Sequence, residues 1–313
     1  GCTGATLRHI AMLKACYSTQ YFAPTHSRSM EKLVPIAQVL SKKALAELIE
    51  PQPINSHLLR DLHNPKLVDA FLVGEKPLAT LQGFKWSEQL RDAVLAIHGG
   101  QLLAAEIAFK EGIAANVAQG FHHASYDYGS GYCTFNGLAL IAQQYPHKRI
   151  FVLDCDQHGG NGTADFAERL PNLFNFTIYG LRFGHVDNER SIGRMIARDT
   201  GSFVQYQHAL YEAFSQIINW QTDLIIYQAG VDCHQHDPFG SQWFDTSCLY
   251  QRDKLVFEFA KRMKIPLFFV LAGGYQELSQ LVDLHVNTFV AAKQVYFPIS
   301  EATIPSYKTY QNL

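Results

Sequence analysis

One segment restricts the fold of this chain more than any other, because an apolar run passes directly into three ligand-type side chains. Residues 150–153 read Ile-Phe-Val-Leu, and Asp154, Asp156 and His158 follow at alternate positions before a Gly-Gly-Asn-Gly turn at 159–162. Alternate side chains of an extended strand point to the same face. The two carboxylates and the imidazole would therefore converge at the carboxyl end of a buried strand, where ligands lie in open parallel sheets.

These three side chains are suitable ligands for a metal ion that keeps one coordination position open. A strand that ends in a solvated Asp and a turn is the simpler interpretation of an Asp-x-Asp pair. The in-phase His158 and the glycines that follow it favour the metal site.

Three further apolar, strand-like runs are each followed by imidazole, carboxylate or phenol side chains close to glycine. These runs are residues 113–118, 224–227 and 265–270, and the side chains that follow them are His122 with His123, Asp232, and Tyr275. Neighbouring histidines on a strand would face opposite sides, so this pair must lie in a loop to share one site. Side chains of this kind are expected to meet at one edge of a parallel sheet.

Apolar runs alternate with helical patterns along the chain. This alternation predicts an α/β fold with a mostly parallel central sheet and helices on both faces. The clearest helical patterns cover residues 91–108, 202–220 and 251–263. Because the functional strand ends must meet, we expect one domain over residues 1–313. Residues 49–55, with two prolines, are predicted to form a loop between two N-terminal helices.

Composition excludes several classes of protein. The 313 residues are 47% hydrophobic and 17% charged, which is typical of a globular protein with ample core. The formal net charge is −2 and we find no Lys/Arg cluster, so we expect no nucleic-acid partner. We find no apolar stretch of membrane-spanning length and no signal peptide, and we predict a cytoplasmic protein without a membrane partner.

Cysteine usage indicates a reducing compartment, because the six cysteines form no Cys-x-x-Cys pair. Cys133, Cys155 and Cys233 lie in or beside the segments described above. The last two are out of phase with the neighbouring carboxylates, so we expect them to be buried by packing.

In combination, these motifs resemble the zinc-dependent histone deacetylase family within the arginase–deacetylase superfamily. The matching segments, in chain order, are residues 99–100, 120–123, 131–136, 154–162, 229–232 and 273–275. Several of them are more similar to class II and class IV members and their bacterial relatives than to class I. The resemblance spans nearly the whole chain and implies a single catalytic domain with the arginase/deacetylase-like fold.

The resemblance also implies a role for each matching residue. The implied ligands of one zinc ion (Zn²⁺) per chain are Asp156, His158 and Asp232. His123 is implied to be the general base and acid, and His122 to tune the charge of the pair. Tyr275 is implied to polarise the substrate carbonyl. Asp154 matches the carboxylate behind His122, and Asn161 matches the polar residue behind His123.

Two further sets of residues are implied by resemblance alone. Phe121, Gly131 and Tyr132 match residues that line the narrow substrate tunnel. A structural potassium ion (K⁺) is implied at Asp154, Asp156, His158 and Thr177. The potassium site is the weaker of the two, because Thr-Ile-Tyr at 177–179 stands where the family usually has Ser-Leu-His or Ser-Ile-His.

The implied activity is hydrolysis of an amide, which removes acetyl or longer acyl groups from lysine side chains. Zinc with three protein ligands keeps a position for water and lowers the pKa of that water. His123 would take the proton as water attacks and return it to the leaving amine. Zinc and the hydroxyl group of Tyr275 would stabilise the oxyanion. The partner is then an acyl-lysine protein or peptide, or an acylated small amine; the oligomeric state stays open.

The same residues admit other interpretations. A two-manganese ureohydrolase would need a carboxylate where the chain has Gly160. His234, His236 and Asp237 could supply extra ligands, but a surface loop is the preferred interpretation. An acetylpolyamine or other small-molecule deacetylase would use the same zinc site. A catalytically inactive acyl-lysine-binding module is disfavoured, because every catalytic group is present.

Overall fold

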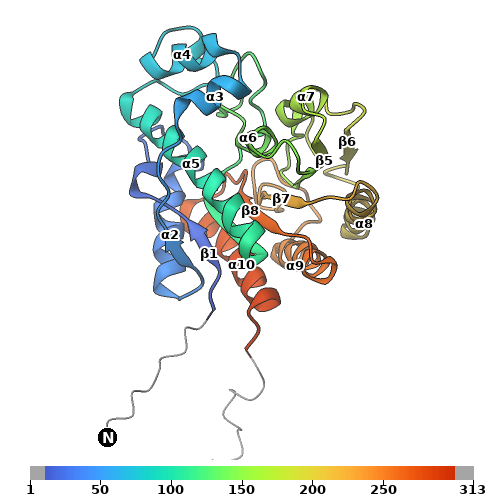
Figure 1. Cartoon of the computed structure of the whole chain (residues 1–313). Coiled ribbons are helices and arrows are strands. Elements are labelled where there is room, and N and C mark those ends of the chain that lie inside the picture. The colour runs from blue at the N-terminus through green and yellow to red at the C-terminus, as the bar shows by residue number, and fades with distance from the viewer. Residues whose placement is uncertain (1–10, 300–313) are drawn as a thin grey trace, which may run out of the picture.

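The computed structural model describes residues 11–299 and has an eight-stranded sheet at its centre (Figure 1). Its strands lie in the order β2-β1-β3-β8-β7-β4-β5-β6, and every neighbouring pair is parallel. The strands are β1 (Lys14–Cys16), β2 (Glu47–Ile49), β3 (Ile113–Gln119), β4 (Ile150–Asp154), β5 (Leu173–Tyr179), β6 (Ser191–Met195), β7 (Leu224–Ala229) and β8 (Leu267–Leu271). The predicted parallel α/β architecture is confirmed.

Helices cover both faces of this sheet, as predicted. The α-helices are α1 (Arg28–Glu31), α2 (Leu33–Lys42), α3 (Ser56–Leu62), α4 (Pro65–Val73), α5 (Glu88–Glu111), α6 (Gly137–Gln144), α7 (Asn161–Arg169), α8 (Phe203–Asn219), α9 (Thr246–Met263) and α10 (Leu278–Tyr296). Two short 3₁₀ helices are η1 (Thr19–Tyr21) and η2 (Leu78–Thr80). Helices α5, α6 and α7 pack on one face, and α2, α10, α9 and α8 pack on the other.

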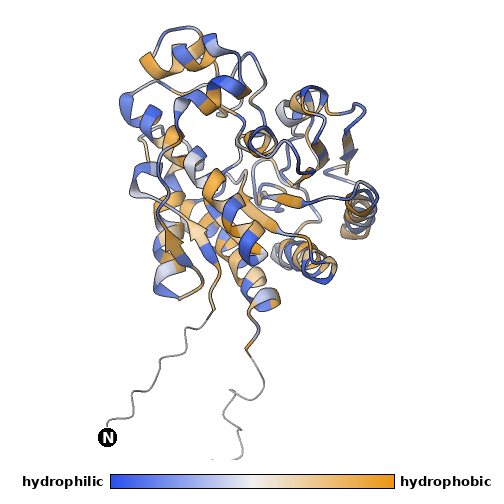
Figure 2. Ribbon diagram, in the orientation of Figure 1, coloured by the Kyte–Doolittle hydropathy of each residue, from blue (hydrophilic) through white to orange (hydrophobic). Residues whose placement is uncertain are grey.

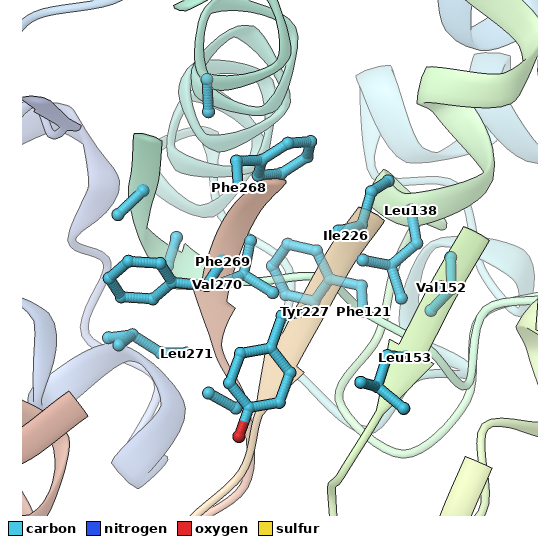
Figure 3. Close-up of a cluster of buried hydrophobic side chains, with 14 of the residues drawn as sticks. Phe121, Leu138, Val152, Leu153, Ile226, Tyr227, Phe268, Phe269, Val270 and Leu271 are labelled. Carbon is cyan, nitrogen blue, oxygen red and sulfur yellow. The ribbon is translucent and has the colours of Figure 1, made fainter. Parts of the chain in front are cut away.

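The central strands are buried on both faces, which explains why they read as continuous apolar runs. Every residue of β4, β7 and β8 is buried, and so is all of β3 except its last residue. Figure 3 shows side chains of these strands packed in one hydrophobic cluster, with Leu138 of α6 beside Val152 and Ile226. Burial of each large apolar side chain stabilises the fold by about 1.5–3 kcal/mol.

Local capping sets the helix boundaries. Helix α8 begins where the sequence predicted it, because Ser202 and Gln205 form a reciprocal capping box. Helix α9 begins five residues before the predicted start at residue 251, because Asp245 accepts a hydrogen bond from the backbone N–H of Cys248 and caps an earlier first turn. The outer helices show mixed hydrophobic and hydrophilic faces, whereas β8 is hydrophobic throughout (Figure 2).

Two expectations about the N-terminal half were wrong. The loop over residues 49–55 follows strand β2 rather than a helix. Helix α5 is long and apolar enough, by length and composition, to cross a membrane, although no such stretch was expected. Its most apolar window is 67% buried inside the protein, as in the core helix of a globular fold.

The cysteines of the described region are unpaired. Cys16, Cys133, Cys155 and Cys233 are buried and Cys248 is half-buried. The expectation that Cys155 and Cys233 are buried by packing is confirmed, and Cys2 lies outside the described residues.

Candidate active site

The sheet order brings the four functional strand ends together. Strands β3, β8, β7 and β4 are immediate neighbours in the sheet although they are far apart in the chain. All run in the same direction, so the loops that follow them lie at one edge of the sheet. The loop after β3 carries the histidine pair, and the other three carry the carboxylates, His158 and Tyr275.

Asp156, His158 and Asp232 form a group with metal-ligand geometry. Nδ1 of His158 lies 3.3 Å from Oδ1 of Asp156 and 3.2 Å from Oδ2 of Asp232. One possible ligand atom from each residue lies within 4.8 Å of the other two. Among residues 11–299, no other group of three such side chains meets this criterion.

Backbone N–H groups hold both carboxylates of this group. Oδ2 of Asp156 accepts a hydrogen bond of 2.6 Å from Gly273, and Oδ1 of Asp232 accepts one of 2.8 Å from Gln157. The other oxygen of each carboxylate faces His158. A side chain at Gly273 would overlap Oδ2 of Asp232, which explains the first glycine of the Gly-Gly-Tyr turn. The ligand group is therefore pre-organised by the loop backbones.

The electrostatics of this group suit a cation. Burial alone would lower the pKa of His158, but the carboxylates of Asp156 and Asp232 raise it to about 10. Burial and the neighbouring charge of Asp156 raise the pKa of Asp232 to about 7. The two buried carboxylates thus favour a positive charge between them. The donor atoms of the group, two carboxylate oxygens and one imidazole nitrogen, fit Zn²⁺. Asp156, His158 and Asp232 would hold the ion.

The two histidines of the pair differ in their partners and hence in charge. Nδ1 of His122 lies 2.6 Å from Oδ2 of Asp154, and Nδ1 of His123 lies 2.7 Å from Oδ1 of Asn161. Burial opposes charge on His122, but the carboxylates of Asp154 and Asp156 outweigh it and raise its pKa. Burial and the repulsion of His122 hold the pKa of His123 well below its usual range. His123 is therefore the neutral imidazole, and its Nε2 is free to accept a proton.

Aromatic rings surround the metal-ligand imidazole. The ring centroid of Tyr275 lies 6.3 Å from that of His158, and the Phe239 ring lies 5.3 Å from His158 and 5.2 Å from Tyr275. Phe183 stacks on His123 with centroids 3.8 Å apart. Phe183 and Phe239 are 42% and 41% exposed, so they stand where the site meets solvent.

Neither of these two phenylalanines was predicted from the sequence to lie at the site. Phe183 precedes Gly184 in the loop after β5, and Phe239 precedes Gly240 in the loop after β7. An aromatic residue beside glycine past a strand end is the same signal that identified Tyr275, so it could have found both.

The residues expected to line the tunnel divide into three cases. Gly131 lies against the site, since a Cβ atom there would be 2.7 Å from His123 and 3.0 Å from Phe183. Tyr132 is 45% exposed and packs on Phe84 at 5.0 Å between ring centroids.

The placement expected for Phe121 was wrong. Its ring is only 2% exposed, and Figure 3 shows it inside the hydrophobic cluster under the sheet edge. The backbone turns at Phe121, with φ of 65°, and the ring packs under α5, stacked on His98 with a centroid separation of 5.5 Å. Burial of a large apolar ring in the core outweighs its exposure in a polar site.

The residues of the implied potassium site are contiguous in space. Thr177 pairs with Asp154 in the β4–β5 register, is fully buried, and its hydroxyl oxygen accepts a hydrogen bond from Gly160. The peptide N–H groups of Asp156 and His158 are directed to the side chains of Asp154 and Asp156. Binding of a monovalent ion there stays a prediction.

The alternative ligand residues have other roles. A Cβ atom at Gly160 would overlap Oδ2 of Asp154, so this backbone cannot carry the second-metal carboxylate. His236 is exposed, but His234 and Asp237 are buried, and the surface-loop expectation was wrong for these two. Both nitrogens of His234 are engaged, with Thr246 on one side and with His236 and Gln276 on the other.

A surface cavity of about 320 Å³ adjoins the histidine pair through Asn161. Its other lining residues are Ser125, Asp127, Tyr128, Ala164, Asp165, Glu168, Arg169, His185 and Asn188. The lining of this cavity has a net negative charge, because it contains three carboxylates and one guanidinium group. None of the three metal-ligand residues lines it.

Comparison with known proteins agrees with this geometry. The model of the histone deacetylase domain matches residues 26–289. An uncharacterized protein of Picosynechococcus sp. is 33% identical over 80% of this chain and 86% of its own length. Histone deacetylase 2 of Arabidopsis thaliana is 28% identical over 78% of this chain and 66% of its own length. Acetylpolyamine amidohydrolase 2 of Pseudomonas aeruginosa is 34% identical, but over only 49% of this chain and 48% of its own length.

The fold has a close counterpart among solved structures. The crystal structure of acetylpolyamine aminohydrolase from Burkholderia pseudomallei superposes with a TM-score of 0.78, covering 90% of this chain and 99% of that one at 14% identity. That likeness concerns the fold alone. The matched domain model, together with the metal-ligand group at the shared strand edge, shows that the chain belongs to the histone deacetylase domain family of amidohydrolases.

Proposed function

We propose that the chain is a zinc-dependent amidohydrolase that removes acetyl or longer acyl groups from lysine side chains. The observation that carries the proposal is the meeting of three functions at one edge of the sheet. The three are a buried ligand group, a histidine of lowered pKa beside one of raised pKa, and a phenol next to the ligand imidazole. A structural or purely binding protein has no need of all three.

The histidine pair would move the proton. Zinc bound to Asp156, His158 and Asp232 would supply Lewis acidity and acidify a water molecule. His123, with Nδ1 hydrogen-bonded to Asn161, presents Nε2 as the base that accepts the proton during attack on the amide carbon. It then returns that proton to the amine nitrogen as the C–N bond breaks, so the products are a carboxylate and a free amine. His122 stays hydrogen-bonded to Asp154 throughout.

Tyr275 would stabilise the oxyanion. Burial and the charges of Asp156 and Asp232 raise the pKa of its phenol, so the hydroxyl stays protonated and can donate at neutral pH. Such a donor acts most strongly once the carbonyl oxygen carries negative charge. The side chain supports catalysis as well as binding, which argues against an inactive acyl-lysine-binding module.

An acylated polyamine is the second candidate substrate. The acidic cavity beside Asn161 favours it, because a second ammonium group on the substrate would be attracted by Asp127, Asp165 and Glu168. A free polyamine derivative and a lysine side chain present the same amide to the reacting groups. The two substrate classes therefore differ only in the groups that flank the amide, which are a second ammonium group in one and a peptide backbone in the other.

A substrate panel tests the proposal. Metal-loaded protein is assayed with acetyl-lysine peptides, longer acyl-lysine peptides and N-acetylated polyamines, with His123→Ala protein as the control for contaminating activity. We expect the highest kcat/KM on an acyl-lysine peptide. A preference for the acetylated polyamines would favour the second candidate, and no hydrolysis of any amide by metal-loaded protein would refute both.

A further inference from the structure

Asp237 is a buried carboxylate that the reaction outlined above does not use. It is 5% exposed, and its two oxygens accept hydrogen bonds from two backbone N–H groups in different loops. Oδ1 accepts one of 3.0 Å from Phe239, and Oδ2 accepts one of 2.8 Å from Tyr275. Burial of an ionisable group is costly unless its hydrogen bonds are made, so these contacts account for its position.

The two N–H groups belong to residues whose rings face the same imidazole. The rings of Phe239 and Tyr275 meet edge to face at 5.2 Å, and their planes lie at 67° and 87° to the ring of His158. The Asp237 carboxylate accepts a hydrogen bond from the backbone N–H group of each of these aromatic residues. One carboxylate therefore fixes two rings relative to each other and to the metal-ligand group.

The loops are joined at other points as well. The N–H of Val231 donates to the carbonyl of Gly273 at 2.8 Å, and the side-chain nitrogen of Gln276 donates to His234 at 3.1 Å. Arg28 of α1 donates to the carbonyl of Gln276. Loss of Asp237 would therefore leave the β8–α10 loop attached to the fold and free only the peptide that carries the phenol.

We propose that Asp237 is the positioning residue for Tyr275, holding its backbone so that the phenol meets the substrate carbonyl. This inference rests on the proposed function, in which the Tyr275 hydroxyl donates to the oxyanion. Asp237 itself touches neither substrate nor reacting atoms. Catalysis is sensitive to placement, since a shift of about 1 Å in a catalytic group can cost about a hundredfold in rate.

The chemistry of the two hydrogen bonds explains why an aspartate is required. A carboxylate offers an acceptor at each oxygen, whereas an asparagine of the same shape offers one acceptor and one NH₂ donor. Asp237→Asn would therefore set a donor against one of the two N–H groups without changing packing. Asp245→Asn is the matched control, because Asp245 also accepts a hydrogen bond from a backbone N–H group, at the exposed N-terminus of α9. Asn caps helices as well as Asp does.

Kinetics on a double-mutant cycle give the first test. Asp237→Asn is expected to lower kcat by about tenfold to a hundredfold with little change in KM or metal content, and Asp245→Asn to leave all three unchanged. In the Tyr275→Phe background, Asp237→Asn should lower kcat little further, because Asp237 acts by positioning a hydroxyl group that is already absent. If the two losses multiply instead, Asp237 acts elsewhere and the proposal is overturned.

A spectroscopic test separates this inference from the proposed function. 3-Fluorotyrosine is placed at position 275 and its ¹⁹F resonance is recorded with and without Asp237→Asn. We expect one sharp resonance in the parent protein and a broadened, shifted or doubled one in the variant, whether or not any substrate is turned over. An identical spectrum in the two proteins overturns the positioning role, whereas an altered spectrum in a protein that hydrolyses no amide refutes only the proposed function.

Discussion

Oδ2 of Asp154 lies 2.6 Å from Nδ1 of His122 inside the protein, and this contact separates the protonation states of two adjacent histidines. Burial holds the pKa of His123 well below its usual range, and the positive charge that Asp154 stabilises on His122, whose ring is centred 4.0 Å away, lowers it further. The uncharged Asn161 gives His123 an orientation without giving it charge. His123 is therefore the member of the pair that we propose as the base.

His123→Ala should reduce turnover by about 10²–10⁴-fold, the usual contribution of a positioned proton shuttle, while the metal content stays unchanged. His122→Ala should have the smaller effect on turnover. Steady-state kinetics and elemental analysis of both variants check this. A nearly active His123→Ala enzyme beside a crippled His122→Ala enzyme would show that the roles are reversed.

Tyr275→Phe should lower turnover by about 10²–10³-fold with little change in KM, because the lost hydrogen bond belongs mainly to the transition state. The substitution keeps the ring, so the edge-to-face contact with Phe239 and the melting temperature should be preserved. A hydroxamate inhibitor should still bind. Undiminished turnover would mean that another group donates to the oxyanion.

Purified protein should bind one zinc ion per chain, and Asp232→Ala should lose it, since Asp232 supplies one of the three ligand side chains. His236→Ala is the matched control: it removes an exposed imidazole from the same loop and should keep the metal. Elemental analysis before and after dialysis against a chelator measures both. Two ions per chain, or unchanged metal content in Asp232→Ala, would contradict the assignment.

Gly131→Ala should lose turnover by about tenfold to a hundredfold, because its new methyl group must displace His123 or Phe183. Its φ of 52° adds a backbone cost of about 1–2 kcal/mol. Gly112→Ala is the control, since Gly112 has φ of 92° with no atom within 4 Å of the added Cβ. Gly112→Ala should lose stability in urea denaturation but keep full activity. Equal activity of the two variants would show that Gly131 does not lie against the active site.

His63 should make the protein sensitive to acid. Burial lowers its pKa to about 3, and both ring nitrogens are engaged, with the carbonyl of Tyr126 and the N–H of Asn136. Below the ordinary pKa of 6.5 the unfolded chain takes up a proton that the folded protein excludes. The free energy of unfolding should therefore fall by about 1.4 kcal/mol per pH unit from this group as pH drops from 6.5 toward 3.

His63→Gln can donate and accept in the same two directions without titrating. Urea denaturation at about pH 7 and about pH 5 compares the two proteins. Between about pH 7 and about pH 5, the free energy of unfolding of the variant should fall by about 2 kcal/mol less than that of the parent protein. Equal losses would show that His63 is not kept neutral by the fold.

The parts of the site that sequence could predict are those set by local geometry. Asp154 ends β4, and Asp156 and His158 follow it directly in the adjoining turn, where the N–H group of each donates to the carboxylate two residues earlier. Ser202 caps α8 through its own third neighbour. The central strands were recognisable because burial on both faces demands a run of apolar residues. Strands β1 and β2, with three residues each, are too short to leave such a pattern.

What sequence could not supply depends on long-range contacts and on single backbone angles. Asp237 is buried because its carboxylate meets Tyr275, a residue 38 positions later in the chain. Phe121 enters the core because of a left-handed backbone conformation at that one residue, although its neighbours reach the site. Neither feature produces a periodic pattern in the sequence from which it could be predicted.

The position of β8 in the sheet has a consequence for biosynthesis. Strands β2, β1 and β3, with the histidine pair, form one block, and β7, β4, β5 and β6, with the ligand carboxylates, form another. Strand β8 is the last to be made, yet it is the one that joins them. The sheet that aligns the histidine pair with the ligand carboxylates is therefore completed only when this last described strand has left the ribosome.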